Sequence, residues 1–351
     1  MVCAMGSDPM SGGTGSIMSN FGERYGEDTV TDPESSAANW VVCEGAWVSG
    51  KIAETTDPYE VRARLQRTIA KRRDCATTAP DRMFAGALLE VLEHPSMRLP
   101  DFPETAQKLD RQLATLEPNY TQVMHTIEAD PKLVGRIWQI ARSARFPKPP
   151  NSLNMAVSRV GLVEIWRISV EMAVEAIQIR SGIFRDQADA TRMHGLLVGD
   201  VTAALAKERR GPQFLAGLLH DVGNLVILEA ASRTEPHPDT VAQVIAAHHA
   251  AFGMLVAQAW ELEPVVGPAI GFHHNPDAVG AGLMDLPRLV AIADIAVSGA
   301  LDHRRARQSF PEVAIQQVTR GNMEPSRPMV LAHRSIDRME RDGLDVMGTA
   351  F

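Results

Sequence analysis

The chain is poor in the residues that build disulfide-stabilised and aromatic-rich proteins. Its 351 residues include three cysteines, Cys3, Cys43 and Cys75, and no CxxC pair. An odd and scattered set of cysteines predicts neither a disulfide framework nor a cysteine zinc site, and it fits a reducing compartment. Aromatic residues make up only 5% of the chain, and sixteen methionines contribute to its apolar content. Because Ala, Leu and Met rank high in helix propensity, this composition favours helices.

The chain also lacks an excess of positive charge and a long apolar run. Its net charge of −8 argues against a broad nucleic-acid-binding surface, although a local basic patch stays open. No uninterrupted apolar run approaches the ~20 residues that span a bilayer. The first residues lack the basic segment and apolar core of a secretory signal. We therefore expect a soluble, cytoplasmic protein with no membrane partner.

Composition divides the chain into four segments. Residues 1–38 are rich in Gly, Ser and Asp, bury little apolar surface, and are expected to form a disordered leader. Residues 39–95 form an N-terminal extension with a strand-like segment at 40–48 and a basic helix. Residues 96–300 are expected to be one all-α domain, because no period-2 alternation occurs between 99 and 300. Residues 301–351 are expected to be a helical C-terminal extension.

The basic helix is predicted over Pro58 to Arg73, since Asp57 can cap it and proline suits the first helical position. Val61, Leu65 and Ile69 repeat on its apolar face. The basic residues that cover much of the remaining surface are Arg62, Arg64, Arg67, Lys71, Arg72 and Arg73. They form either a solvated helical face or a contact surface for an acidic partner or nucleic acid.

Histidine and aspartate are concentrated in the second half of the chain. Seven of the eleven histidines lie between residues 194 and 274. The candidate metal ligands are His194, His220, Asp221, His249, His273, His274 and Asp294. Imidazole and carboxylate groups bind borderline and hard divalent metals, so this concentration predicts one or two metal ions inside a helical core.

Each candidate ligand also has a simpler explanation. His194 lies on the apolar face of a helix predicted over 188–208, where a lone histidine is often a hydrogen-bonded core residue. His220 and Asp221 are predicted within one helix that begins at Pro212. A buried carboxylate such as Asp221 needs a partner, which is either a metal ion or a buried arginine.

The remaining ligands are predicted on three further helices. His249 lies in a helix over 240–262, and His273 and His274 end a segment over 264–274, where the helix dipole would also favour a cationic imidazole. Asp294 lies within an apolar helix, where an unpaired aspartate is rare. Five separate helices thus each contribute a histidine or an aspartate.

These ligands can be divided between two ions. One ion would use His194, His220, Asp221 and Asp294, and a second would use Asp221 as a bridge with His249 and one or both of His273 and His274. Two such ions would activate a water and stabilise charge on a phosphate oxygen. A metal that only ties five helices together is a further possibility.

Several segments carry a resemblance to a known family. They are LPDFPET (99–105), ADPKL (129–133), ARSARFPKP (141–149), FLAGLLHDVGNLVI (214–227), HHAAFGMLVAQAWEL (248–262), PAIGFHH (268–274) and VAIADIAV (290–297). Together they resemble the HDOD domain, a bacterial signalling relative of the HD superfamily of metal-dependent phosphohydrolases. The resemblance implies a compact, multi-helix HD-type fold that is often used as a regulatory output module.

The resemblance also bears on the metal ligands. Many members of the family lack a complete metal set, whereas all seven candidates in this chain fall where the related HD-GYP phosphodiesterases would be expected to place a ligand. His248 is an extra histidine without an assigned role. Two features depart from the phosphodiesterases: Asn224 stands where HDxGK has lysine, and the GYP segment is replaced by residues 275–280. Asparagine cannot supply the positive charge that stabilises a phosphate.

We therefore expect a signal-transduction or regulatory module with a divalent metal site that holds Fe, Mn, Zn, Ni or Mg. Its expected partner is a protein of a signalling pathway or a nucleotide-like small molecule. The alternative is a metal-dependent phosphohydrolase or phosphodiesterase acting on a nucleotide or another phosphoester, with Asp221 as the bridging ligand.

Overall fold

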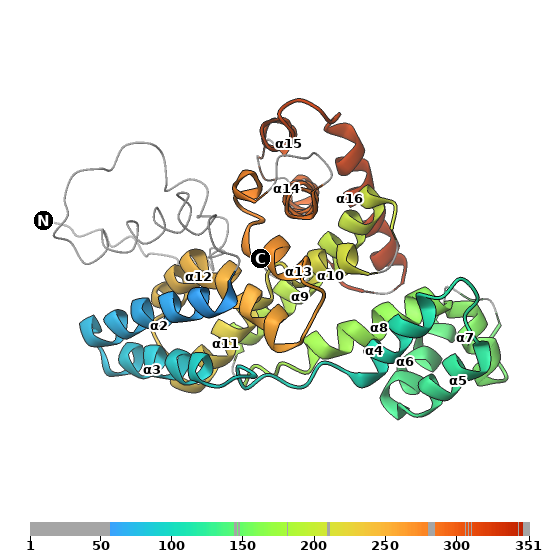
Figure 1. Ribbon diagram of the computed structural model, residues 1–351. Coiled ribbons are helices and arrows are strands. Elements are labelled where there is room, and N and C mark those ends of the chain that lie inside the picture. Colours follow the sequence, from blue (N-terminus) through green and yellow to red (C-terminus); the bar gives the residue numbers. More distant parts are fainter. Residues whose placement is uncertain are drawn as a thin grey trace, which may run out of the picture.

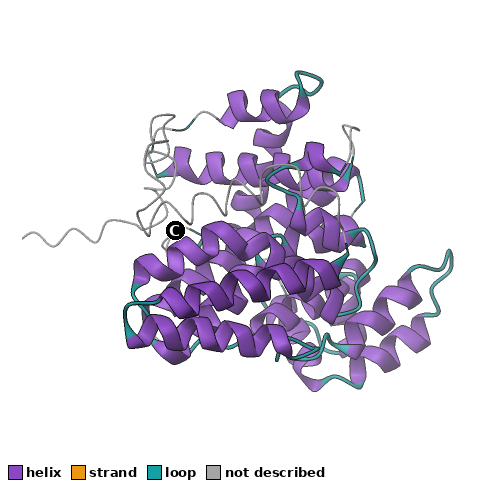
Figure 2. Cartoon of the chain, turned by 60° about the vertical axis from the view of Figure 1, so that its left-hand side comes forward, coloured by secondary structure: helices purple, strands orange, loops and turns teal. Residues whose placement is uncertain are grey.

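The computed structural model describes residues 57–346, apart from 144–145, 147, 181, 209–210, 280–284, 306, 308, 310 and 343. All regular elements in this part of the chain are helices, as Figure 2 shows, which confirms the all-α prediction. The predicted disordered leader (1–38) and the strand-like segment (40–48) lie outside the described residues.

The first group of helices combines segments from the two halves of the chain. Its members are α2 (Pro58–Cys75), α3 (Ala79–Glu93), α11 (Val222–Thr234) and α12 (Pro238–Ala259). Side chains cap the starts of α2 and α3, because Asp57 accepts from the backbone of Tyr59 and Thr78 accepts from that of Asp81. Figure 1 shows these helices lying side by side, and α2 and α3 contact α12 and α11, respectively.

The second group forms a separate lobe, at the lower right of Figure 1. Its helices are α4 (Glu104–Leu113), α5 (Tyr120–Glu128), α6 (Pro131–Ala141), α7 (Leu153–Val160) and α8 (Leu162–Glu175). The segment before α4 is held against the end of α12, since Trp260 donates its indole N–H to the Pro100 carbonyl over 2.9 Å. The Trp260 ring also packs against Phe102, with centroids 5.5 Å apart.

The third group joins the centre of the molecule to the C-terminal segment. Its elements are α9 (Gly182–Ala206), α10 (Pro212–Leu219), α13 (Val266–Gly271), the 3-10 helix η1 (Pro276–Ala278), α14 (Leu286–Arg304), α15 (Pro311–Thr319) and α16 (Ser326–Arg341). The last helix packs on α9 and α14. Arg304 on α14 forms ion pairs with Asp337 and Glu340 on α16, the latter at 2.7 Å.

Residues 301–351 are therefore helical where the structure describes them, and α16 packs on the same core as the central helices. The same holds for the N-terminal side, where Leu65 of α2 and Leu92 of α3 are fully buried in the core. The segments on both sides of residues 95 and 300 contribute to one core. The expected division of the chain at these residues stays a prediction.

One helix prediction was wrong at the centre of the molecule. His220 and Asp221 were expected inside a single helix, but α10 ends at Leu219 and α11 begins at Val222. Asp221 leaves the helical region, with φ −104° and ψ 11°. The reason is tertiary packing, because the backbone on either side of the break approaches its neighbours too closely for any side chain. A Cβ built on Gly223 would lie 1.9 Å from the His249 carbonyl oxygen.

Two helical stretches are long and apolar enough to cross a membrane by length and composition, residues 212–234 and 238–259. The most apolar 18 residues of the two stretches are 89% and 67% buried within the fold, respectively. They also carry Asp221 and the buried histidines His220 and His249. Both stretches are therefore mostly buried inside the fold.

Helix α2 begins at Pro58 as predicted, and Val61, Leu65 and Ile69 are buried. Two of its basic residues are used inside the protein: Arg62 donates to the Leu92 carbonyl over 2.7 Å, and Arg72 donates to Gln243 over 3.1 Å. The basic residues that are exposed are Arg67, Lys71 and Arg73. Only half of the six basic residues of α2 are therefore exposed to solvent.

Candidate metal centre

The fold brings all seven candidate ligands to one place. Helix α9 supplies His194, the break between α10 and α11 supplies His220 and Asp221, α12 supplies His249, the turn after α13 supplies His273 and His274, and α14 supplies Asp294. Three sets have ligand atoms within 4.8 Å of one another: His249 with His273 and His274; His194 with His220 and Asp221; and His220 with His273 and Asp294. Because these sets share members, they form one continuous cluster.

Three of the imidazole rings are oriented by the backbone in the same way. The Nδ1 atoms of His220, His249 and His273 lie 2.8, 2.8 and 2.6 Å from the carbonyl oxygens of Gly217, Ile245 and Ile270, respectively. A carbonyl oxygen can only accept, so Nδ1 carries the proton in each ring and Nε2 keeps its lone pair. This arrangement fixes the tautomer that binds a metal through Nε2.

Asp221 lies between two of these rings. Its Oδ2 atom is 3.4 Å from His220 Nε2, and its Oδ1 atom is 3.4 Å from His249 Nε2. Each oxygen of one carboxylate thus faces a different imidazole. This is the placement expected of a carboxylate that bridges two ions, and the break before α11 makes it possible.

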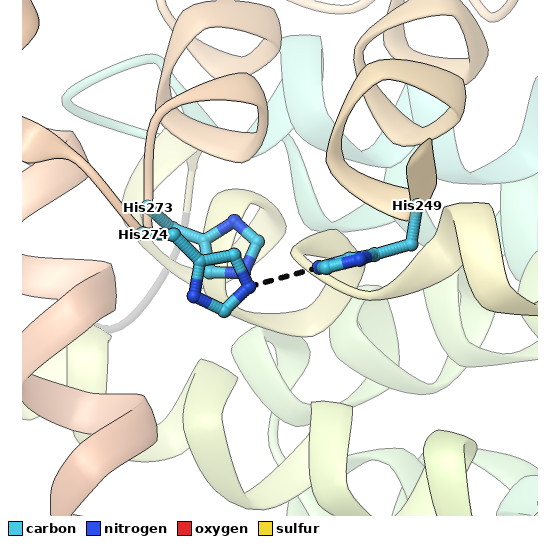
Figure 3. A group of neighbouring side chains, drawn as sticks. All are labelled: His249, His273 and His274. Atoms are coloured by element: carbon cyan, nitrogen blue, oxygen red, sulfur yellow. Dashed lines mark hydrogen bonds between the residues drawn. The ribbon is translucent and has the colours of Figure 1, made fainter. Parts of the chain in front are cut away.

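Figure 3 shows how the two consecutive histidines after α13 approach α12. His249 and His274 meet through their Nε2 atoms, which are 3.0 Å apart. The rings of His273 and His274 lie with centroids 3.9 Å apart. His273 is buried while His274 is exposed, so this part of the cluster reaches from the core to the surface.

On the opposite side, His194 and Asp294 form a direct hydrogen bond of 2.9 Å between Nε2 and Oδ1. Ser298, one turn further along α14, also donates to Asp294 Oδ1, over 3.4 Å. Sequence reasoning missed Ser298, although its i+4 spacing from Asp294 is a usable signal. Sequence reasoning also missed the backbone carbonyls that orient the imidazoles, because no pattern of side chains predicts them.

The electrostatics of the cluster favour charged carboxylates and a neutral imidazole at His273, but they favour the protonated form at His194. Burial opposes ionisation of Asp221 and Asp294, but the surrounding imidazoles, with the His194 hydrogen bond to Asp294, hold both pKa values below the ordinary range. Burial opposes protonation of His194 too, yet its hydrogen bond to Asp294 raises its pKa. Burial and the neighbouring His274 ring lower the pKa of His273 well below its ordinary value.

The donor set fits a divalent metal ion. The Nε2 atoms of His220 and His273 are buried and have no hydrogen-bond partner in the described part of the chain. A buried polar atom without a partner costs free energy, and a metal ion removes that cost at a nitrogen lone pair. The side chains of Asp221 and Asp294 are 21% and 22% exposed, so solvent reaches one edge of the cluster.

His248, the neighbour of His249, belongs to none of the three ligand sets. It is buried, and burial together with the positive charge of Arg72 lowers its pKa to about 4. The basic residues of α2 likewise supply no ligand to these sets. His248 therefore lies on the same helix as the candidate ligand His249 but is not itself placed to bind the metal.

The comparisons with known proteins agree with this architecture. The profile of the HDOD domain family matches residues 99–276, which is about half of the chain. An uncharacterized protein from Treponema pallidum (strain Nichols) is 23% identical over an alignment that covers 70% of this chain and 51% of the relative. The chain therefore spans about half the length of that curated relative.

Solved structures with the same fold come from several bacteria. A candidate metal-dependent phosphohydrolase from Shewanella amazonensis SB2B has a TM-score of 0.52 at 20% identity, covering 74% of this chain and 98% of that one. A candidate signal transduction protein from Marinobacter aquaeolei VT8 has a TM-score of 0.52 at 18% identity, covering 74% and 64%. An HDOD domain protein of unknown function from Geobacter sulfurreducens has a TM-score of 0.50 at 18% identity, covering 72% and 92%. At these identities the likeness shows the fold.

Proposed function

The chain belongs to the HDOD domain family, and we propose that it is a regulatory module of signal transduction whose helical core holds a divalent metal centre. The observation that carries the metal is the placement of Asp221, with one carboxylate oxygen facing His220 and the other facing His249. The fixed Nδ1 tautomers of the surrounding rings support it, because they leave Nε2 lone pairs for coordination.

The centre would hold one or two ions. His194, His220, Asp221 and Asp294 would bind the first, and Asp221 with His249, His273 and His274 would bind the second. Five imidazoles and two carboxylates favour Fe, Mn, Zn or Ni over Mg, since Mg²⁺ prefers oxygen ligands and retained water. A divalent ion bound there supplies Lewis acidity toward an anionic oxygen, or ties the five ligand-bearing segments together.

The residue three positions after the His-Asp pair favours a regulatory role over catalysis. Asn224 stands where the related phosphodiesterases carry a lysine, and it is 3% exposed on α11. A buried neutral amide supplies no positive charge to a phosphate. The names of relatives with the same fold include a candidate signal transduction protein, which supports the same role.

The alternative function is a metal-dependent phosphohydrolase that acts on a nucleotide or another phosphoester. The exposure of His274 and the partial exposure of Asp221 and Asp294 favour it, because a substrate phosphate needs access to the centre from solvent. The name of one relative, a candidate metal-dependent phosphohydrolase, points the same way. In this function Asp221 would hold the ions on which turnover depends.

The deciding experiment measures the metal content of purified wild-type protein by elemental mass spectrometry, beside Asp221→Ala and the matched variant Asp239→Ala. Asp239 is an exposed carboxylate at the start of α12 and belongs to no ligand set. We expect about one to two equivalents in wild type and Asp239→Ala, and loss in Asp221→Ala. Wild-type protein that binds no metal after reconstitution would contradict the proposal.

Phosphoester turnover with added Mn²⁺ or Fe²⁺ separates the two functions. A regulatory module shows no turnover above the level of Asp221→Ala, whereas a hydrolase loses turnover in that variant. Turnover that is equal in wild type and Asp221→Ala excludes a mechanism at this centre. Turnover that wild type shows and the variant lacks replaces the regulatory role by the alternative.

The expected partner is a protein of a signalling pathway or a nucleotide-like small molecule. The exposed basic residues of α2, Arg67, Lys71 and Arg73, offer a surface for an acidic partner. Reversing these three charges is expected to weaken partner binding while Asp221→Ala preserves it. Nucleic acid could use the same basic surface, and a salt-dependent loss of RNA or DNA binding would identify it.

A further inference from the structure

A second polar site lies away from the metal centre, where α16 packs against the central helices. A pocket of about 210 Å³ opens between α8, α9 and α16. The polar residues that line it are Arg167, Asp200, Arg334, Ser335 and Arg338. Its remaining lining comes from small and aliphatic residues of α9 and α16. None of the candidate metal ligands contributes to it.

The lining carries more positive than negative charge. Three guanidinium groups face one carboxylate, that of Asp200, among the described residues that line the pocket. Asp200 forms ion pairs with Arg167 and Arg338. Arg334 is exposed at the rim and has no ion-pair partner among the described residues. Its charge is therefore available to an anion that enters the pocket.

The innermost arginine is built into the core. Arg167 is 5% exposed, and its guanidinium lies 3.9 Å over the ring of Phe214. Its Nε atom is buried without a hydrogen-bond partner in the described part of the chain, although the terminal nitrogens reach Asp200 and, at 3.7 Å, Glu164. A buried N–H donor without an acceptor costs free energy, and a bound anion that accepts from it would remove that cost.

Two further groups fit an anion site. Ser335 donates to Asp200 Oδ2 over 2.8 Å, which holds the carboxylate on the α16 side of the pocket. Glu171, on the same helix as Arg167, is buried near Glu164, and this raises its pKa to about 8. That carboxyl therefore keeps its proton to a higher pH than an ordinary glutamate, which reduces the negative charge beside the arginines.

We propose that this pocket binds the phosphate group of a small soluble molecule. Guanidinium groups present paired N–H donors that match the oxygens of a phosphate, and rigid stacking of Arg167 on Phe214 reduces the entropy lost on binding. The pocket is too small for a nucleic-acid backbone or a folded partner to enter. The site is independent of the metal centre, so it can exist whether or not the proposed ions bind.

The test is isothermal titration calorimetry of the full chain with inorganic pyrophosphate at constant ionic strength. Arg334→Ala is expected to weaken binding about tenfold, since it removes a charged donor. Arg341→Ala removes an exposed arginine from the same helix outside the pocket and is expected to leave the affinity unchanged. Equal affinity of wild type and Arg334→Ala would overturn the proposal, as would the absence of saturable binding.

Two more variants separate this site from a structural network and from the metal centre. Asp200→Asn removes the competing carboxylate and is expected to tighten pyrophosphate binding, whereas a purely structural ion cluster predicts no gain. Asp221→Ala, treated with chelator, is expected to bind pyrophosphate as wild type does. Binding that is lost in Asp221→Ala and kept in Arg334→Ala would place the anion at the metal centre and refute the pocket.

Discussion

His194 and Asp294 are one hundred residues apart in the chain, yet their Nε2 and Oδ1 atoms form a 2.9 Å hydrogen bond. The contact joins α9 to α14 at one edge of the histidine cluster. Asp294 Oδ1 also lies 3.9 Å from His220 Nε2, so the carboxylate faces two imidazoles. The side chains of His194, His220 and Asp294 are therefore neighbours in the fold, although they come from distant parts of the sequence.

Gly223 provides a sharp test of how packing places the His-Asp pair. Its Cβ would lie 1.9 Å from the His249 carbonyl oxygen and 2.8 Å from the Gly253 nitrogen, and both are backbone atoms of a buried helix. Gly223→Ala must separate α11 from α12, so we expect a loss of about 3 kcal/mol or more in the free energy of unfolding. Urea denaturation followed by circular dichroism measures it.

The matched control is Gly135→Ala on α6, where nothing lies within 4 Å of the added Cβ. This exposed helical position should gain about 0.5–1 kcal/mol, because alanine is the better helix former. Equal stability of Gly223→Ala and wild type would mean that the two helices pack less closely than the structure shows.

The sequence predicts the helices well where local signals mark their starts. Asp57 before Pro58 caps α2 where the capping pattern places it. The ends are predicted less well. The helix predicted over 240–262 ends at Ala259, since no glycine or proline directly follows that position.

The candidate ligands could be chosen from residue type and spacing, but their geometry could not. The break between His220 and Asp221 depends on the contact of Gly223 with α12, which only the folded chain creates. The same is true of Arg167 and Asp200, whose pairing with Arg338 joins three segments far apart in the sequence. Local patterns report helices, whereas such pairings depend on the tertiary arrangement.

Glu171 should give the chain a distinctive pH dependence. Its pKa of about 8 in the folded state lies above the ordinary value of 4.5, because of burial and the nearby Glu164. Between these two values the native state keeps a proton that the unfolded chain releases. The free energy of unfolding therefore falls as pH rises through this window, by up to about 1.4 kcal/mol per pH unit.

Glu171→Gln stays neutral at every pH and removes this loss. We expect its melting temperature to exceed that of wild type at pH 8 by several degrees, at about 2–4 °C for each kcal/mol, and to approach it near pH 4.5. Scanning calorimetry across the pH range measures the difference. Glu175→Gln, an exposed position one turn further along α8, should keep the wild-type slope. A parallel slope in Glu171→Gln would show that Glu171 ionises normally.

Arg62 and Arg67 lie on the same basic helix but should behave differently. Arg62 NH1 donates to the Leu92 carbonyl over 2.7 Å and to the His94 carbonyl over 3.2 Å, which ties α2 to the end of α3. Arg62→Ala should therefore cost about 1 kcal/mol in the free energy of unfolding. Arg67→Ala, at an exposed position, should change it by less than about 0.5 kcal/mol. If chemical denaturation shows the same loss in the free energy of unfolding for both variants, the hydrogen bonds of Arg62 do not stabilise the fold.

Two consecutive histidines on α12 allow the metal centre to be separated from its supporting core. His249 belongs to a ligand set and is held by the Ile245 carbonyl, whereas His248 is buried outside every ligand set. His249→Ala should lose most of the bound metal, measured by elemental mass spectrometry. His248→Ala should keep it and instead lose about 2–3 kcal/mol in the free energy of unfolding, as expected for a cavity in the core.

The contrast is informative because both variants remove the same side chain from neighbouring positions of one helix. A general loosening of α12 would lower the metal content of both variants alike, so the ratio of metal content between them isolates coordination from stability. Metal retained by His249→Ala and lost by His248→Ala would reverse the assignment of the two rings. Because the Nδ1 atom of His249 already donates to a carbonyl, its Nε2 atom, which faces His274 and Asp221, is the one that would bind the ion. The substitution His249→Gln, which keeps a polar atom near the Nε2 position, should then retain more metal than His249→Ala, and a failure of this order would argue that His249 acts through packing.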